Sequence, residues 1–503
     1  MQILYKSTRG GEEGVPASRA ILNGLASDGG LYVPETIPEL DISLEELAGK
    51  PYSFVAYEVM RRFLTDFTEE ELKRCILSAY DEKFDTPEIA PLHKTGENTY
   101  FLELYHGATI AFKDMALSIL PYLMTTAARK NNVKDEIVIL TATSGDTGKA
   151  ALAGFADVPG TRIVVFYPKY GVSPVQEKQM VTQKGDNTCV IGITGNFDDA
   201  QTAVKKMFED KKLAEQLSEK GFRFSSANSI NIGRLVPQIA YYVWSYARLL
   251  EQNAIRSEEE INIVVPTGNF GNILAAYYAR QMGLPVHTLV CASNENKVLY
   301  DFFRTGVYDR RREFILTSSP SMDILISSNL ERLIYRICGN DASLCAEKMN
   351  SLKADGWYDI TEEQKEALRC FYGGYCSQEE TKQTIAALYK EEKYLIDTHT
   401  AVAADVYRKY REAEKDPRPT VIACTASPYK FTRSVVEALK AVTDIPSDTE
   451  EMDDFALADL LQQVTGMPVP KAVEEIRNAP VLHDKVVDAC DMPQAVMSFL
   501  VGR

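Results

Sequence analysis

The segment HGATIAFKD at 106–114 places a lysine among apolar residues. Lys113 directly follows Ala111 and Phe112, and Met115 lies two positions further on. Apolar surroundings remove the solvation that favours an ammonium group, so we expect the pKa of Lys113 to lie below its ordinary value. A lysine of this kind suits covalent bonding to a carbonyl group and proton transfer. Taken alone, the pattern is more typical of a lysine whose charged end reaches the surface.

A second candidate is the segment ATSGDTGKA at 142–150, which ends the apolar run EIVILTA and leads into AALAGF. Hydroxyl and backbone N–H groups at a helix N-terminus can bind an anion such as a carboxylate. A nucleotide-binding P-loop is disfavoured, because its GxxxxGK[ST] pattern would need Gly at Thr143 and Ser or Thr at Ala150. The alternative interpretation is a simple strand-to-helix turn in which Ser144 or Asp146 caps the helix.

The third candidate is the segment PTGNFGN at 266–272, which follows the apolar run INIVVP. Its two glycines let the backbone approach a phosphate group closely, and the helix expected after it supplies free N–H groups. The spacing is not that of a GxGxxG dinucleotide site, so the loop suits a single monophosphate. An ordinary Gly-Asn turn is the alternative interpretation.

The fourth candidate is CTASPYKF at 424–431, at the end of the apolar run TVIACTA. The hydroxyl of Thr425 could meet a heteroatom of a ligand, and Lys430 could meet an anion. A turn and helix cap at Ser427 and Pro428 is the alternative.

The elements that must position these motifs alternate between strand and helix. Short β-branched runs at 136–142, 161–168, 261–266, 286–292 and 420–426 each precede Gly- or Asn-rich punctuation and then a helical pattern. This order predicts an α/β fold with open, mainly parallel sheets and helices on both faces. Such sheets bind ligands at the carboxyl ends of their strands, where the motifs above occur.

The domain organisation is predicted from composition and spacing. Residues 1–95 read as an N-terminal region, 96–240 as a first α/β part with the Lys113 segment and a smaller domain, and 241–445 as a large α/β domain. Residues 348–393, rich in Lys and Glu, are predicted to be amphipathic helices inserted in the large domain. Residues 446–503 are predicted to form a C-terminal helical tail.

The composition limits the class of protein. A chain of 503 residues with 45% hydrophobic residues can bury a substantial core. A formal net charge of −16 without a basic patch predicts no binding to nucleic acid. Nine scattered cysteines and five histidines without ligand spacing predict neither disulfides nor a metal site. With no secretion signal and no continuous apolar span, we expect a cytoplasmic protein that does not enter a membrane.

Together the four motifs resemble the threonine synthases of the bacterial and fungal branch, which are fold type II pyridoxal-phosphate enzymes related to the tryptophan synthase β subunit. Further segments match in the family's order, GLASDGGLYVP at 24–34, NSINIGRL at 228–235, PSMD at 320–323 and DTHT at 397–400. The resemblance runs from near the N-terminus to about Leu439 and leaves mainly the acidic tail unexplained.

The resemblance implies a site for pyridoxal 5'-phosphate. Lys113 would bind the cofactor covalently and transfer protons. The glycine-containing loop at 266–272 would hold the cofactor phosphate, and Thr425 would hydrogen-bond the pyridine nitrogen. Asp146 would lie near the cofactor hydroxyl, at a position where related enzymes commonly have Asn. The loop residues are Gly268, Asn269, Phe270, Gly271 and Asn272.

The resemblance also implies a substrate site and a reaction. The substrate O-phospho-L-homoserine would be met by Ser144, Thr147, Lys149, Asn228, Ser229, Asn231, Arg234 and Lys430. Water would add at Cβ and phosphate would leave Cγ, which makes the enzyme a carbon–oxygen lyase that forms L-threonine. Among the cations we favour Arg234 for the phosphate, because its planar fork suits phosphate oxygens. We expect a monomer or weak homo-oligomer, and we interpret His399 as a structural residue near a helix start.

Two alternatives follow from the same motifs. Another fold type II enzyme, such as a serine or threonine dehydratase or a β-replacement synthase, would share the lysine and the glycine loop. A catalytically inactive binding protein could also keep the fold, although the intact Lys113, loop and Thr425 speak against it.

Overall fold

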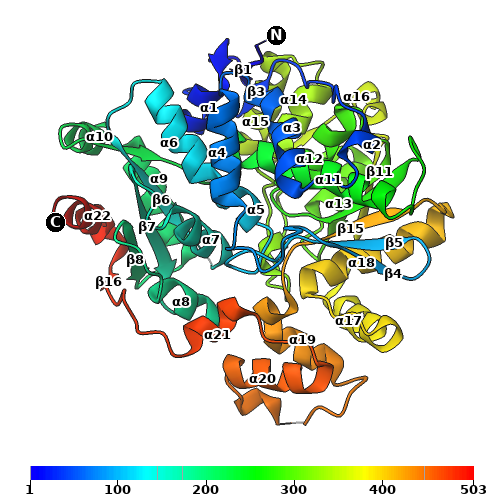
Figure 1. The fold of residues 1–503 in the computed structure, drawn as a ribbon. Coiled ribbons are helices and arrows are strands. Elements are labelled where there is room, and N and C mark those ends of the chain that lie inside the picture. Colours follow the sequence, from blue (N-terminus) through cyan, green and yellow to red (C-terminus); the bar gives the residue numbers. More distant parts are fainter. Residues whose placement is uncertain (1, 144, 173, 447, 503) are drawn as a thin grey trace.

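The computed structural model describes residues 2–143, 145–172, 174–446 and 448–502, and two sheets form its framework. In Figure 1 the five-stranded sheet stands at the left, the larger sheet at the right, and the N-terminal helices above them. The predicted α/β class with mainly parallel sheets is confirmed.

The five-stranded sheet is parallel throughout, in the order β16-β8-β7-β6-β9. The central strands β6 and β7 are buried along most of their length because helices cover both faces. The strands are β6 (Glu136–Ala142), β7 (Thr161–Pro168), β8 (Thr188–Ile193), β9 (Phe222–Ser225) and β16 (Val486–Val487). The helices around them are α7 (Asp146–Phe155), α8 (Pro174–Val181), α9 (Phe197–Glu209), α10 (Lys211–Ser218) and α22 (Met492–Val501).

The six-stranded sheet has the order β14-β11-β10-β15-β5-β4, and only the edge strand β4 runs antiparallel to its neighbour. Its strands are β4 (Leu92–Thr95), β5 (Thr99–Glu103), β10 (Ile261–Pro266), β11 (Val286–Ser293), β14 (Phe371–Tyr375) and β15 (Thr420–Cys424). One face packs on α11 (Ile232–Glu251), α12 (Gly271–Gln281) and α13 (Val298–Thr305), and the other on α17 (Gln378–Glu392), α18 (Thr398–Glu414) and α19 (Thr432–Leu439).

The N-terminal part contributes a small three-stranded sheet and a layer of helices that joins the main core. Its elements are β1 (Leu4–Ser7), β2 (Val15–Pro16), α1 (Ala17–Asn23), β3 (Tyr32–Pro34), α2 (Leu44–Leu47), α3 (Tyr52–Phe63) and α4 (Glu69–Ala79). Two helices, α5 (Asp114–Leu117) and α6 (Leu120–Lys130), follow the Lys113 segment. The buried residues of α3 and α4 recur every three or four positions, the spacing of an amphipathic helix.

Further elements complete the fold. They are β12 (Val307–Asp309), α14 (Leu330–Ile337), α15 (Ala342–Ala354), β13 (Trp357–Asp359), α16 (Glu362–Glu366), α20 (Asp454–Thr465) and α21 (Lys471–Arg477). Four single 3-10 turns are η1 (Pro320–Met322), η2 (Pro428–Phe431), η3 (Thr449–Glu451) and η4 (Ala489–Asp491).

The prediction that residues 348–393 are helical is wrong in part, because two strands, β13 and β14, lie within this range. The sequence of β14, FYGGY, does not indicate a strand, because glycine has a low preference for β-strands. Both glycines are needed for close packing. A Cβ at Gly374 would lie 2.4 Å from Cγ1 of Val406 on α18, and a Cβ at Gly373 would lie 3.0 Å from Cβ of Phe303.

The C-terminal segment connects the two halves of the molecule. Its helix α20 contacts α19 beside the larger sheet, whereas its strand β16 pairs with β8 at the edge of the smaller one. Figure 1 shows this orange-to-red segment crossing from the bottom of the view to its left side. The sheets do not follow the predicted boundaries at residues 95, 240 and 445, because β4 and β5 both lie in the larger sheet and β16 lies in the smaller one.

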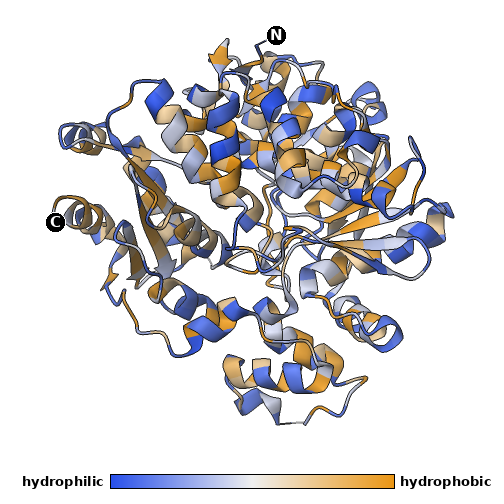
Figure 2. Ribbon diagram, in the orientation of Figure 1, coloured by the Kyte–Doolittle hydropathy of each residue, from blue (hydrophilic) through white to orange (hydrophobic). Residues whose placement is uncertain are grey.

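Burial follows the hydropathy of the sequence. Figure 2 shows hydrophobic residues on the strands of the five-stranded sheet and mixed residues on the surrounding helices. In the described part of the chain, no helix has the length and apolar character needed to span a membrane.

Candidate functional site

The Lys113 segment is fastened to the carboxyl end of β15. The backbone N–H of Phe112 donates to the carbonyl oxygen of Thr425 at 2.8 Å, and the N–H of Ser427 donates to that of Ile110 at 3.0 Å. Strand pairing of this kind brings Lys113 and Thr425 to the same end of the larger sheet, although they are far apart in sequence. This is the end at which parallel sheets bind ligands.

The Lys113 amine lies among polar groups at the bottom of this site. Its side chain is only 12% exposed, and Nζ lies 3.2 Å from Oγ of Ser321 and 3.5 Å from Oδ2 of Asp146. Burial lowers the pKa of Lys113 below its ordinary value, partly offset by the charge of Asp146. A lysine that gives up its proton more readily is suited to covalent chemistry.

Asp146 lies between two lysines. Nζ of Lys430 lies 3.3 Å from its Oδ1, and Nε2 of Gln176 donates to the same oxygen at 3.1 Å. Burial alone would raise the pKa of the Asp146 carboxyl, but the positive charges of Lys430 and Lys113 outweigh it and hold the pKa well below its usual range. Asp146 is therefore a carboxylate at neutral pH, as long as both lysines stay close.

Lys430, which was expected to meet an anion of the substrate, has a wholly buried side chain. Nζ donates to the carbonyl oxygen of Thr109 at 3.0 Å and to Oε1 of Gln179 at 3.2 Å, in addition to its ion pair with Asp146. With a fully buried side chain and three acceptors, this ammonium group balances the Asp146 carboxylate.

A histidine and an aspartate support Ser321. The backbone N–H of Ser321 donates to Nε2 of His399 at 3.2 Å, so Nδ1 carries the ring proton and donates to Oδ2 of Asp397 at 2.8 Å. Oγ of Ser321 donates to Oδ2 of Asp146 at 3.1 Å. His399 lies at the start of α18, as expected, and it also belongs to the hydrogen-bond network around Lys113.

The glycine loop turns directly into α12. Phe270 adopts a left-handed conformation with φ of 65°, and no side chain caps the first-turn N–H groups. A Cβ at Gly268 would lie 2.6 Å from the carbonyl oxygen of Ser321, so only glycine fits there. Oδ1 of Asn272 accepts from the hydroxyls of Tyr241 and Tyr242, whereas its buried Nδ2 has no partner among the described residues.

Two further cations lie near this end of the sheets. Arg234, in the first turn of α11, is buried, donates to the carbonyl oxygen of Ala227 at 3.1 Å, and has an Nε without a partner among the described residues. Burial lowers the pKa of Arg234 to about 10. Burial, with a contribution from Lys430, lowers the pKa of Lys149 to about 8, and its Nζ donates to Gln183 at 2.6 Å.

The other predicted substrate residues have different surroundings. Asn231 caps α11, and its amide donates to the backbone oxygens of Ile21 and Ser226. Asn228 is exposed, and Ser229 accepts from Nδ2 of Asn329 at 3.3 Å. Thr147 lies half-buried in the first turn of α7, and Ser144 lies outside the described residues.

Three site residues were not identified from the sequence as functional. Ser321 and His399 lie within segments that resemble the family, PSMD and DTHT, so a signal existed for them. Gln176 lies in no such motif. Its contact with Asp146 depends on how α8 packs on α7, which the sequence pattern does not reveal.

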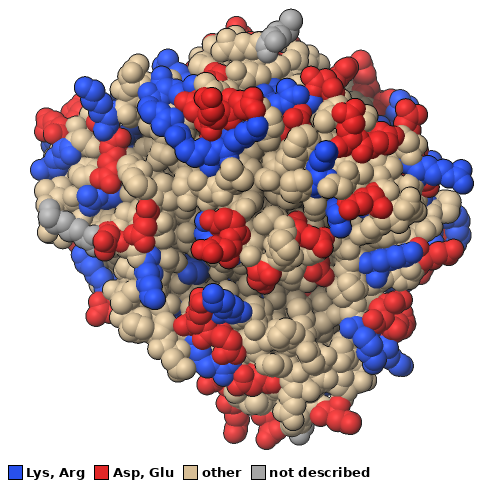
Figure 3. All heavy atoms as spheres, in the orientation of Figure 1, with Lys and Arg blue, Asp and Glu red and all other residues tan. Residues whose placement is uncertain are grey.

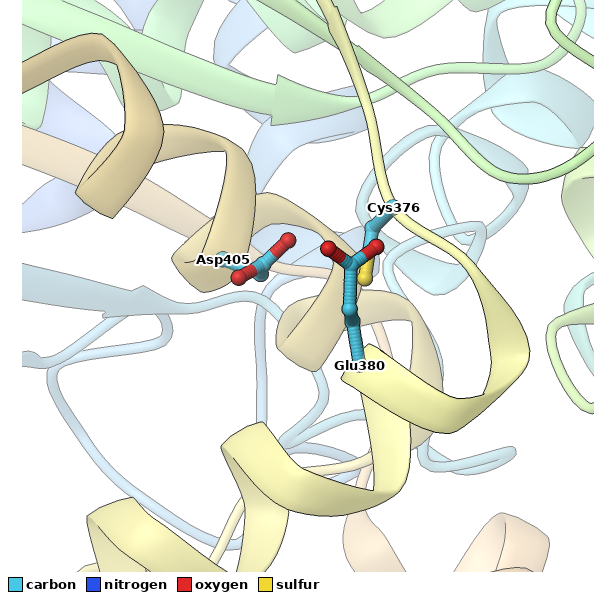
Figure 4. A group of neighbouring side chains, drawn as sticks. All are labelled: Cys376, Glu380 and Asp405. Carbon is cyan, nitrogen blue, oxygen red and sulfur yellow. The ribbon is translucent and has the colours of Figure 1, made fainter.

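A separate cluster of polar side chains lies at the helices α17 and α18, which cover one face of the larger sheet. Cys376, Glu380 and Asp405 point toward one another (Figure 4), a set of groups that can bind a metal ion. The cluster already holds a cation, because Nζ of Lys409 lies 2.8 Å from Glu380 and 2.7 Å from Asp405. Burial also raises the pKa of the Cys376 thiol well above its ordinary value. We therefore interpret this group as an ion-pair cluster between α17 and α18.

Three family models match the chain. They describe the threonine synthase N terminus over residues 4–80, a pyridoxal-phosphate-dependent enzyme over residues 84–427, and the threonine synthase C-terminal region over residues 400–479. The threonine synthase of Schizosaccharomyces pombe is 36% identical over 480 residues, which cover 89% of this chain and 92% of that protein. The chain belongs to the threonine synthase family.

Other relatives agree with this assignment. Threonine synthase-like 1 of Pongo abelii is 39% identical over 84% of this chain, and the chain spans 58% of the length of that protein. The crystal structure of threonine synthase from Brucella melitensis with bound pyridoxal phosphate has a TM-score of 0.87 at 33% identity and covers 99% of this chain. The yeast threonine synthase structure has a TM-score of 0.87 at 30% identity and covers 100% of it.

The cofactor of this family fits the site. Pyridoxal 5'-phosphate needs a lysine amine, a backbone cradle for its phosphate and polar groups around its ring. The chain offers Lys113, N–H groups at the start of α12 that no side chain caps, and Nδ2 of Asn272, for which the described residues provide no partner. These groups lie at the carboxyl ends of neighbouring strands, β10 and β15, beside the Lys113 segment. The fold type II architecture predicted from the motifs is confirmed.

Proposed function

We propose that this chain is a threonine synthase, which converts O-phospho-L-homoserine and water into L-threonine and phosphate. The observation that carries the proposal is a lysine amine beside Asp146 and Ser321, with the buried Arg234 nearby and the half-buried Lys149 as a further cation on α7. A substrate with a phosphate dianion needs such cations, whereas a dehydratase substrate without phosphate does not.

The cofactor would be held by residues from four segments. Lys113 would carry it covalently, the backbone of residues 268–272 would hold its phosphate, and Thr425 would hydrogen-bond its ring nitrogen. The charged Asp146 would lie near its hydroxyl group. When bound, pyridoxal phosphate supplies an electron sink for the negative charge left by proton removal.

The remaining chemistry belongs to the chain itself. Lys113, with its lowered pKa, would take and return protons at Cα and Cβ of the substrate. Arg234 and Lys149 would stabilise the leaving phosphate, and Thr147, Asn228 and Ser229 are additional candidates for substrate contacts. Buried cations favour a dianion strongly because the surroundings screen charge less than water does.

The test is incubation of the purified, cofactor-loaded protein with O-phospho-L-homoserine, followed by chromatography for threonine and an assay for phosphate. The proposal requires equal amounts of threonine and phosphate. Release of ammonia from threonine without phosphate release from phosphohomoserine would instead identify a dehydratase. An absence of both reactions in a protein with bound cofactor would favour an inactive binding protein.

Other properties stay predictions of the sequence. They are the cytoplasmic location, the monomeric or weakly oligomeric state, and the absence of nucleic acid binding. Positive and negative side chains are interspersed on the face shown in Figure 3, which favours the last of these.

A further inference from the structure

Arg332 holds a positive charge in a fully buried position. Its side chain, in the first turn of α14, donates from Nε to the carbonyl oxygen of Tyr32 at 2.9 Å and from the other nitrogens to Asn329 Oδ1 and the carbonyl oxygen of Ile230, both at 2.5 Å. None of these acceptors is charged, and the neighbouring Glu331 pairs with Arg9 at 2.7 Å. Burial lowers the pKa of Arg332 to about 10, which reflects the cost of this desolvated charge.

Asn329 connects this charge to the glycine loop. Its Nδ2 donates to the carbonyl oxygen of Asn269 at 3.0 Å, and its backbone N–H donates to the same oxygen at 3.1 Å. A Cβ added at Gly271 would lie 3.5 Å from Nδ2, so the amide packs against the first residue of α12. Arginine can only donate, so Arg332 requires Oδ1 to face it and Nδ2 to face the loop.

We propose that Arg332 is a positioning residue for the cofactor phosphate, acting through Asn329 on the backbone of Asn269 and through its own charge on the dianion. The bound phosphate would balance a buried cation that has no directly bonded carboxylate among the described residues. In a low-dielectric interior such a charge acts over a longer distance than it would in water. The inference rests on the proposed role of the loop and is independent of the reaction catalysed.

The experiment compares two arginines on the same helix. Arg336, one turn further along α14, donates to the carbonyl oxygen of Pro34 at 2.7 Å, so Arg336→Met also removes a bond between α14 and β3. Only Arg332→Met removes the contact with Asn329. For each apo-protein, the dissociation constants of pyridoxal phosphate and of pyridoxal, which lacks the phosphate, are measured by titration of absorbance.

We expect Arg332→Met to weaken pyridoxal phosphate binding at least tenfold and pyridoxal binding less than twofold. Arg336→Met should change both less than twofold. Inorganic phosphate should raise the unfolding temperature of the wild-type apo-protein and not that of Arg332→Met. Equal weakening of both ligands, or unchanged pyridoxal phosphate binding, would overturn the proposal.

A second variant guards against loss of folding. If Arg332→Met does not fold, Asn329→Ala keeps the arginine and removes the connection to the loop. Asn329→Ala should weaken the binding of pyridoxal phosphate and leave the binding of pyridoxal nearly unchanged. Equal weakening for both ligands would count against the inference. Because no turnover is measured, these results stand whether or not the proposed threonine synthase reaction is found.

Discussion

Lys430 and Asp146 form a buried ion pair, and we predict that this pair contributes to the stability of the folded protein. Lys430→Met should lower the free energy of unfolding by about 3 kcal/mol, because it leaves a buried carboxylate with one cation fewer. In an Asp146→Asn background the same change should cost clearly less, since the carboxylate has already been removed. Urea unfolding of the four proteins measures this difference. Equal costs in both backgrounds would show that the two side chains are not coupled.

At the residue level, the sequence predicted the groups that lie in contiguous motifs at strand ends. The glycine loop and Thr425 were chosen because each follows an apolar run, and Lys113 because it lies among apolar residues. The structure brings Lys113 and Thr425 to the same end of the larger sheet. The direction of a side chain was not predictable. The contacts of Lys430 with Thr109 and Gln179, for example, join residues that are distant in sequence.

Among the elements, the Lys113 segment is tied to its surroundings by His106. Nδ1 of His106 lies 2.5 Å from Asp85, and Nε2 lies 2.9 Å from Glu103 on β5. Burial alone would lower the pKa of this imidazole, but the two carboxylates outweigh it and raise the pKa to about 9. Its folded-state pKa thus lies above the ordinary value of 6.5.

We predict that His106 contributes about 3 kcal/mol to the free energy of unfolding, because a rise in pKa from 6.5 to about 9 corresponds to roughly 3.5 kcal/mol and solvent screens the half-exposed Asp85. This contribution is fully present below about pH 6.5 and is lost as the pH rises through about 9. Urea unfolding between pH 6 and pH 10 measures it. The difference between wild type and His106→Gln should shrink with rising pH, and a constant difference would contradict the prediction.

Strands and helices with clear periodicity were predictable, but β14 was not. The sequence signal for a strand is apolar and β-branched residues, whereas β14 needs two glycines because α13 and α18 approach it closely. This requirement comes from packing between elements that are distant along the chain. The strands β6, β7 and β10 contain no glycine, and their apolar, β-branched sequences predicted them directly.

In the whole molecule, the C-terminal segment closes the smaller sheet. Met492, Val496 and Leu500 of α22 are buried against the same cluster as Ile191 and Ile193 of β8. The sequence predicted a helical tail here, but the pairing of β16 with β8 joins segments roughly 290 residues apart in the chain, and no local pattern indicates such a contact.

Deletion of residues 484–503 should therefore destabilise the smaller sheet by roughly 5 kcal/mol, given about 1.5–3 kcal/mol for each buried apolar side chain. Thermal unfolding and binding of a hydrophobic dye measure the effect. The deletion should lower the unfolding temperature and increase dye binding, whereas the control Val481→Ser, at a residue that is 53% exposed, should change neither. An unchanged unfolding temperature in the deletion would contradict the role assigned to α22.

The proposed chemistry depends most on Lys113 as the residue that carries the cofactor. Borohydride reduction of the protein loaded with pyridoxal phosphate, followed by mass mapping of its peptides, locates that residue directly. We predict the added mass on the peptide that contains Lys113, no labelling in a folded Lys113→Ala variant, and loss of turnover in that variant. Labelling of Lys430, Lys149 or another lysine in the wild-type protein would contradict the account.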